Sequence, residues 1–167
     1  SKKKLKENIK CNPQNYYGYT KYLAERYLLK KKLNVCIGRI FSYSSKNQKK
    51  SFFIPSIIEK LKFSKNNIIK VENVNHYRDF LTTKEIVDAI KILFKNKSNG
   101  IWNICSSKKV KLVDIIKEIN KFYKKNIKII KGNRQTTLIG NNNKIKKLGW
   151  KISNKSYLSK IKKIFSL

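Results

Sequence analysis

The sequence predicts an α/β fold, because short apolar segments alternate along it with amphipathic segments of helical spacing. Pro13 and Pro55 each stand near the start of such a helical segment, where proline is favoured. Thr82 and Glu85 have the spacing of a capping box. The chain has 167 residues, of which 40% are hydrophobic, and this is enough for a folded core.

These patterns give the following order of elements. The expected helices cover residues 13–32, 54–63, 84–94 and 112–123, with shorter ones at 142–148 and 156–165. The expected strands cover residues 34–41, 68–71, 100–105 and 126–130. The first of these strands, NVCIGRIF, is almost continuously apolar, which is typical of a strand buried on both faces.

The charge is strongly one-sided. Lys and Arg number 41 and Asp and Glu 9, which gives a formal net charge of +32. A surface this basic can attract phosphate backbones or acidic membranes. However, lysine is spread from Lys2 to Lys163 together with abundant Asn and Ile, whereas nucleic-acid binders gather Arg on one face. We therefore expect no specific nucleic-acid partner, and a basic nucleic-acid-binding module stays open as an alternative.

Other features restrict the compartment and the kind of site. Cys11, Cys36 and Cys105 lie far apart, which predicts reduced thiols. The single histidine, His76, cannot build a metal cluster, so no metal site is expected. No apolar run approaches the length of a membrane span, and the lysine-rich start lacks the apolar stretch of a signal peptide. We expect a cytoplasmic protein without a membrane partner.

A tyrosine and a lysine lie four residues apart at Tyr17 and Lys21, and again at Tyr27 and Lys31. With so many lysines, about two such pairs are expected by chance, so the spacing alone carries no information. Residues four apart share a helix face. There an ammonium would favour the phenolate form of a tyrosine, whose unperturbed pKa is about 10, and so suit it to acid–base work.

Four stretches together distinguish the first pair from the second. The segment NPQNYYGYTKYLAE, followed by GRIF, resembles the extended short-chain dehydrogenase/reductase family that acts on nucleotide sugars. Three further segments resemble landmarks of that family in the same order: RDFLTTKEIVDAI (78–90), GIWNICSS (100–107) and RQTTLIGNNNKIKKLGW (134–150). Tyr27 and Lys31 have no such context, which is typical of a solvated helix face.

The resemblance implies the C-terminal part of a Rossmann-like doubly wound parallel sheet plus a small α/β substrate-binding domain. Residues 1–50 would belong to the dinucleotide-binding part and residues 51–167 mainly to the substrate domain, with segments at about 70–95 returning to the sheet. The six glycines never approach GxGxxG spacing. The glycine-rich turn and a catalytic Ser or Thr are therefore expected before Ser1, and the isolated fragment is expected to be inactive.

The resemblance also assigns roles to residues. Tyr17 would exchange a proton with a sugar hydroxyl or ketone while NAD or NADP exchanges a hydride, and Lys21 would also hold the nicotinamide ribose. Both residues would therefore contact the cofactor. Ser42 would contact the substrate, and Arg78 and Arg134 would hold the diphosphate of a nucleotide sugar. The complete enzyme is expected to be a homodimer.

The reaction is predicted from residues 39–48, RIFSYSSKNQ, which resemble the RxFNxxGPGQ segment of GDP-4-keto-6-deoxymannose reductases and GDP-mannose 4,6-dehydratases. Ser42 replaces the Asn that contacts substrate, and SKN replaces Gly-Pro-Gly. A 4-keto-6-deoxy-sugar nucleotide reductase is the first hypothesis, with a 4,6-dehydratase or a 4-epimerase as alternatives. A non-catalytic remnant also stays open.

Overall fold

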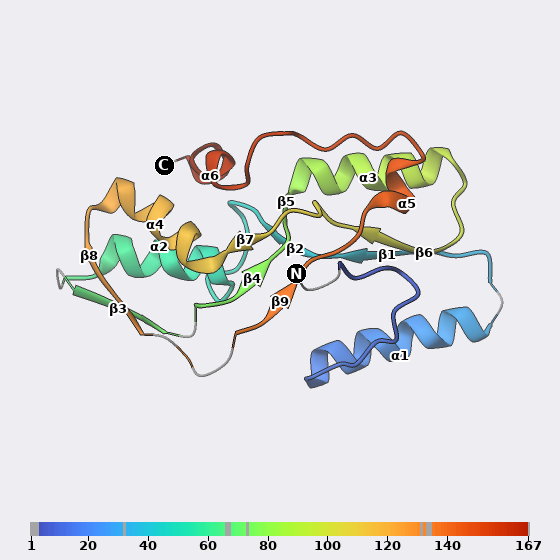
Figure 1. Cartoon of the computed structure of the whole chain (residues 1–167), viewed down its shortest axis with the longest axis horizontal. Helices are drawn as coiled ribbons and strands as arrows, with labels where there is room; N and C mark the ends of the chain where they lie inside the picture. The colour runs from blue at the N-terminus through green and yellow to red at the C-terminus, as the bar shows by residue number, and fades with distance from the viewer. Residues whose placement is uncertain are drawn as a thin grey trace.

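A computed structural model of the chain describes residues 4–31, 33–65, 68–72, 74–130, 132 and 135–166 (Figure 1). The helices are α1 Tyr16–Lys30, α2 Phe53–Phe63, α3 Thr83–Lys95, α4 Leu112–Tyr123, α5 Asn143–Lys146 and α6 Leu158–Phe165. The longer strands are β1 Cys36–Ile40, β3 Ile68–Glu72, β6 Gly100–Ile104 and β8 Asn126–Ile130. The shorter strands are β2 Ser42–Ser44, β4 Tyr77–Arg78, β5 Phe80–Thr82, β7 Val110–Lys111 and β9 Thr137–Leu138.

Parallel pairing joins segments that lie far apart in the sequence. β1 pairs with β6, β2 with β5 and β3 with β8, and all three pairs are parallel. β4 lies between β7, which is antiparallel to it, and β9, which is parallel. Parallel strands connected by helices confirm the predicted α/β class.

The helix starts follow local capping chemistry. The Asn15 side chain caps α1 by accepting a hydrogen bond from the Gly18 N–H at 2.8 Å. Pro13 was predicted to lie in the first turn of this helix, and that prediction is wrong, because the cap fixes the start at Tyr16. The capping box of α3 is confirmed: Thr82 accepts from the Glu85 N–H, and the Glu85 carboxylate accepts from the Thr82 N–H.

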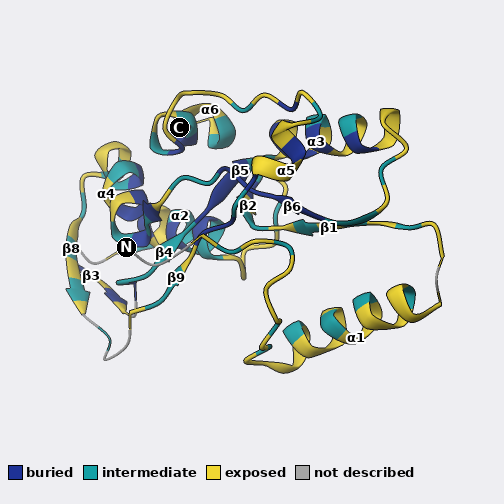
Figure 2. Cartoon of the chain, turned by 45° about the vertical axis from the view of Figure 1, so that its right-hand side comes forward, coloured by how far each residue is buried: buried dark blue, intermediate teal, exposed yellow. Residues whose placement is uncertain are grey.

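Two apolar clusters form the core (Figure 2). One lies between α2, α4, α6 and β3 and contains fully buried side chains such as Leu61, Ile116 and Ile161. The other lies between α3, β6 and α5 and contains Trp102 and Ile145. Each such side chain contributes about 1.5–3 kcal/mol to folding through burial.

β1 departs from the prediction of a strand buried on both faces. Cys36, Gly38 and Ile40 are exposed, and the residues between them are half-buried. Within the described chain β1 pairs along one edge with β6. Its exposed side chains, together with Ile90 and Phe94 of α3, line an open groove. The apolar run indicates a strand that can be buried on both faces, but the described part of this chain leaves β1 partly exposed.

The Asp79 carboxylate connects, through hydrogen bonds, its own position between β4 and β5 with the segment after β6 and the segment before α5. Asp79 lies between β4 and β5 and is fully buried. It accepts hydrogen bonds from the Ser106 hydroxyl and N–H, from the Ser107 N–H at 2.9 Å and from the Gly140 N–H at 3.1 Å. A Cβ atom on Gly140 would overlap the side chain of Cys105. Burial raises the pKa of Asp79, while these donors act in the opposite direction.

We predict that Asp79→Asn lowers the free energy of unfolding by about 2–3 kcal/mol, because an amide nitrogen would face backbone donors that need an acceptor. The control is Asp88→Asn, which removes an exposed ion pair with Lys84 and should cost less than about 0.5 kcal/mol. Urea unfolding of both variants measures the difference. Equal losses would contradict the role assigned to Asp79.

Candidate functional site

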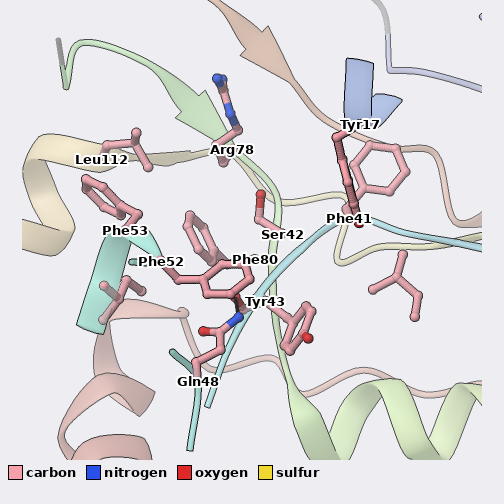
Figure 3. Close-up of a pocket in the computed structure, with 12 residues that line it drawn as sticks. Tyr17, Phe41, Ser42, Tyr43, Gln48, Phe52, Phe53, Arg78, Phe80 and Leu112 are labelled. Atoms are coloured by element: carbon pink, nitrogen blue, oxygen red, sulfur yellow. Dashed lines mark hydrogen bonds between the residues drawn. The ribbon is translucent and has the colours of Figure 1, made fainter. Parts of the chain in front are cut away.

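A cavity of about 540 Å³ lies where α1, β2, β4 and the start of α2 meet. Four polar side chains line it: Tyr17, Ser42, Gln48 and Arg78. The remaining lining residues are apolar or aromatic: Ile40, Phe41, Tyr43, Phe52, Phe53, Ile54, Phe80 and Leu112. Figure 3 shows Arg78, Ser42 and Tyr17 along one part of the cavity, with Phe41 beside Tyr17 and with Phe52, Phe53 and Phe80 on the other side of Ser42.

Tyr17 lies in the first turn of α1, and its side chain is largely exposed. The Lys21 Nζ lies 5.5 Å from the centre of the Tyr17 ring. The second pair has nearly the same geometry, with the Lys31 Nζ 5.6 Å from the centre of the Tyr27 ring. What separates the two pairs is their location, since Tyr17 lines the cavity together with Ser42 and Arg78, while Tyr27 lines a separate hollow formed by residues of α1 itself.

Of the two site residues predicted on α1, Tyr17 lines the cavity and Lys21 does not. Lys21 is exposed one helical turn after Tyr17 and is not among the described residues that line the cavity. The structure therefore brings Tyr17, Ser42 and Arg78 together around one space, and places Lys21 beside Tyr17 only.

The Arg78 guanidinium group is hydrogen-bonded to the described residues through one of its three nitrogens. Its Nη1 donates to the Tyr77 carbonyl at 2.8 Å and to the Thr136 hydroxyl at 2.9 Å. Every hydrogen bond that Arg78 makes to the described residues uses Nη1, so Nη2 and Nε can donate to a ligand. Among the described residues that line the cavity, Arg78 is the one that carries a charge. Burial lowers the pKa of Arg78, but a guanidinium starts from so high a pKa that it stays protonated.

The segment from Gln135 to Leu138 runs beside Arg78. β9 pairs with β4, so that Leu138 lies opposite Arg78. His76 fixes this segment, because its Nδ1 accepts a hydrogen bond from the Thr136 N–H at 3.1 Å. Burial, with a smaller contribution from the Arg78 charge, lowers the pKa of His76. Arg134, the other predicted diphosphate contact, lies outside the described residues.

Sequence reasoning missed most of the aromatic lining of the cavity. Phe41, the adjacent Phe52 and Phe53, and Phe80 come from three separate parts of the chain, and no periodic pattern connects them. Gln48 carried a signal, since it ends the segment RIFSYSSKNQ that had been singled out for its resemblance. Its Oε1 is buried without a hydrogen-bond partner among the described residues.

A second, smaller cavity of about 340 Å³ adjoins the first, and the two share Phe53 and Leu112 as lining residues. Ser56, Lys60 and Glu72 contribute polar groups to it. Phe53 and Leu112 thus form part of the wall of each cavity. No helix in the described part of the chain is both long and apolar enough to cross a membrane.

Parallel strand pairs with intervening helices, and a cavity at the carboxyl end of β1 that the start of α1 flanks, define a Rossmann-like α/β protein. Residues 1–105 match the NAD dependent epimerase/dehydratase family. The chain belongs to that family.

Solved structures agree with this fold. RMD from Pseudomonas aeruginosa, complexed with NADPH, is 22% identical and matches with a TM-score of 0.80 over 96% of this chain and 58% of its own. The dTDP-glucose 4,6-dehydratase from Bacillus anthracis, in complex with NAD, is 16% identical, with a TM-score of 0.81 over 98% of this chain and 55% of its own. The UDP-N-acetylglucosamine 4-epimerase from Methanobrevibacter ruminantium is 18% identical, with a TM-score of 0.81 over 97% of this chain and 56% of its own.

These matches confirm the predicted Rossmann-like α/β fold. The chain spans a little more than half the length of the solved structures that it matches.

We predict that His76 titrates below its ordinary pKa of about 6.5. Because the native state then binds this proton less readily than the unfolded state, the contribution of His76 to the unfolding free energy should be constant above about pH 6.5 and fall at lower pH. A protonated Nδ1 can no longer accept from the Thr136 N–H. His76→Asn, whose amide oxygen accepts at every pH, should remove this part of the pH dependence. NMR titration, assigned by comparison with the variant, gives the pKa, and a value at or above 6.5 would refute the prediction.

Proposed function

We propose that the complete gene product is an NAD(P)-dependent enzyme that modifies nucleotide sugars, and that it reduces the keto group of a 4-keto-6-deoxy-sugar nucleotide. The observation that carries the proposal is the convergence of Tyr17, Ser42 and Arg78 on one cavity. A phenol able to move a proton and a guanidinium able to hold a phosphate thus border the same space. Membership of the epimerase/dehydratase family supports this assignment.

The cofactor fits part of this chain. The Lys21 ammonium and the Tyr17 hydroxyl are exposed side by side on α1 and can donate hydrogen bonds to ribose hydroxyls. The sequence offers no GxGxxG turn for the pyrophosphate. When bound, NAD(P) would supply or accept the hydride at the sugar carbon. NAD and NADP remain equal candidates, since solved structures of similar fold contain one or the other.

In the proposed reduction Tyr17 donates a proton to the keto oxygen, which gains negative charge as the carbonyl is reduced. The Ser42 hydroxyl, which lines the same cavity as Tyr17, donates a second hydrogen bond to the substrate. Lys21 stabilises the tyrosinate that remains, since an ammonium one helical turn away favours the charged phenol. Arg78 holds a phosphate oxygen through Nη2 and Nε. Arg134 is proposed as a second phosphate contact on the basis of its sequence context alone.

The aromatic lining favours a deoxy sugar. Phe41, Phe52, Phe53 and Phe80 offer apolar surface suited to a methyl group at C6. The adjoining cavity, with Ser56, Lys60 and Glu72, would take the nucleoside. A 4,6-dehydratase or a 4-epimerase would use the same Tyr17 but would regenerate its cofactor in every cycle. A non-catalytic remnant, or a nucleic-acid-binding module using the dispersed lysines, would leave the cavity without a role.

The organisation of the whole protein is proposed on the same basis. Residues 1–50 would form the end of the dinucleotide-binding domain, and residues 51–167 mainly the substrate domain. The contacts of α3 and the pairing of β6 with β1 support a return of the chain to the first sheet. A homodimer in the cytoplasm, without a membrane or a specific nucleic-acid partner, completes the proposal.

We predict that Tyr17→Phe lowers kcat of the complete gene product by about 10²- to 10⁴-fold, the usual effect of losing a general acid, while cofactor affinity changes little. Tyr27→Phe is the matched control, because Tyr27 has the same lysine neighbour but lies away from the cavity. Steady-state kinetics and cofactor titration measure both effects. Equal and mild losses in the two variants would remove Tyr17 from the mechanism.

We predict that Arg78→Lys raises KM for the nucleotide sugar by roughly 10- to 150-fold. The estimate corresponds to the loss of one hydrogen bond to a charged group, about 1.5–3 kcal/mol, because an ammonium cannot reproduce a bidentate contact at unchanged net charge. Arg26→Lys, on the exposed surface of α1, should leave KM unchanged. Kinetics with both substrates varied separates the outcomes. A loss confined to cofactor affinity would show that Arg78 does not hold the substrate.

A further inference from the structure

Helix α1, which carries Tyr17, is attached to the rest of the chain by little apolar contact. The structure describes all of its residues, and none of the fifteen is buried. Gly18, Tyr22, Glu25 and Leu28 form a half-buried stripe on the side that faces the fold. Figures 1 and 2 show α1 set apart from the other helices, below β1. Within this chain, apolar contacts therefore do little to fix the rotation of α1 about its axis.

The charged member of that stripe, Glu25, makes a two-point contact with β1. The Arg39 Nε donates to Glu25 Oε2 at 2.8 Å, and Arg39 Nη2 donates to Glu25 Oε1 at 2.5 Å. The third nitrogen, Nη1, donates to the Glu7 carbonyl at 2.9 Å. The Arg39 and Glu25 side chains are only 22% and 11% exposed, so water competes weakly for these bonds. A bidentate pair of this type restrains orientation as well as distance.

The contact extends into the sheet. The Glu7 carboxylate accepts a hydrogen bond from the Asn103 N–H of β6 at 3.1 Å. The Asn103 side chain is buried and donates to the Leu5 carbonyl at 2.9 Å. Arg39 therefore binds α1 to a strand pair that is itself fixed to the N-terminal segment.

Glu25 and Arg39 are each close in sequence to a residue that lines the proposed site. Tyr17, Lys21 and Glu25 follow one another at intervals of four residues and so lie along one side of α1. Arg39 stands three residues before Ser42, which lines the cavity together with Tyr17. The pair thus joins α1, which carries Tyr17, to β1, and β1 continues within two residues into β2, which carries Ser42.

We propose that Glu25 and Arg39 are positioning residues, which hold α1 at the rotation and register that bring the Tyr17 hydroxyl against the substrate beside Ser42. This inference rests on the proposed function. A slip of α1 by one turn would move Tyr17 by about 5.4 Å. A displacement of only about 1 Å can cost about 100-fold in rate.

The test uses the complete gene product with Glu25→Gln and with a graded pair, Arg39→Lys and Arg39→Gln. Glu25→Gln should lower kcat about 10- to 100-fold and leave KM for the nucleotide sugar within about twofold, because Arg78 still holds the substrate. Arg39→Lys, which keeps the charge but not the two-point contact, should fall between the wild type and Arg39→Gln. Glu118→Gln, which removes the surface pair with Lys121, is the matched control and should change neither constant.

Hydrogen–deuterium exchange separates positioning from a general loss of structure and does not depend on the reaction. In Glu25→Gln the amides of α1 should exchange faster, while those of α3 and α4 keep their protection. Unchanged exchange in α1, or an equal loss of protection throughout the chain, would overturn the proposal. If the wild type turns over no nucleotide sugar, the proposed function fails. In that case, faster exchange confined to α1 would still support the conclusion that Glu25 and Arg39 restrain this helix. If exchange in α1 were unchanged as well, that conclusion would also be wrong.

Discussion

The buried Asp79 carboxylate is the interaction on which the arrangement of the site depends. It stands between β4 and β5, and its donors belong to the connection after β6 and to the segment before α5. Arg78 is its direct neighbour in the chain, so the position of the guanidinium follows from the bonds that Asp79 makes. Asp79 thus affects the site without contacting a ligand, because it fixes the backbone that carries Arg78.

The two sides of the cavity are held by different forces. The side made by α2, α4 and β5 rests on a core of close-packed aliphatic and aromatic residues, including the stacked rings of Phe80 and Tyr157. The side made by α1 depends on hydrogen bonds and charge, above all on the pair between Glu25 and Arg39. Within this chain, the residue proposed to hold the substrate thus stands among tightly packed elements, whereas the proposed acid–base residue stands on a helix held mainly by polar contacts.

Features that depend on neighbouring residues could be predicted from the sequence, whereas contacts between distant segments could not. The capping box of Thr82 and Glu85 and the helices of strong apolar periodicity were predicted, because they depend on neighbours in the chain. The strands of two or three residues are too short to show a period, and they exist only through their pairing. Tyr17 was singled out by its sequence context. The aromatic lining of the cavity was missed, since it forms only when separate segments fold together.

The fate of the hydride tests the central claim most directly. The complete gene product would be incubated with a GDP-4-keto-6-deoxy sugar and, in parallel reactions, with NADH or NADPH that carries deuterium at both hydrogens of nicotinamide C4, and the product would be analysed by mass spectrometry. The account predicts that at least one of the two cofactors gives one deuterium per product sugar, bound at C4, with one cofactor oxidised for each. A product without deuterium, or conversion of a GDP-hexose with no net oxidation of the cofactor, would contradict the assignment as a reductase.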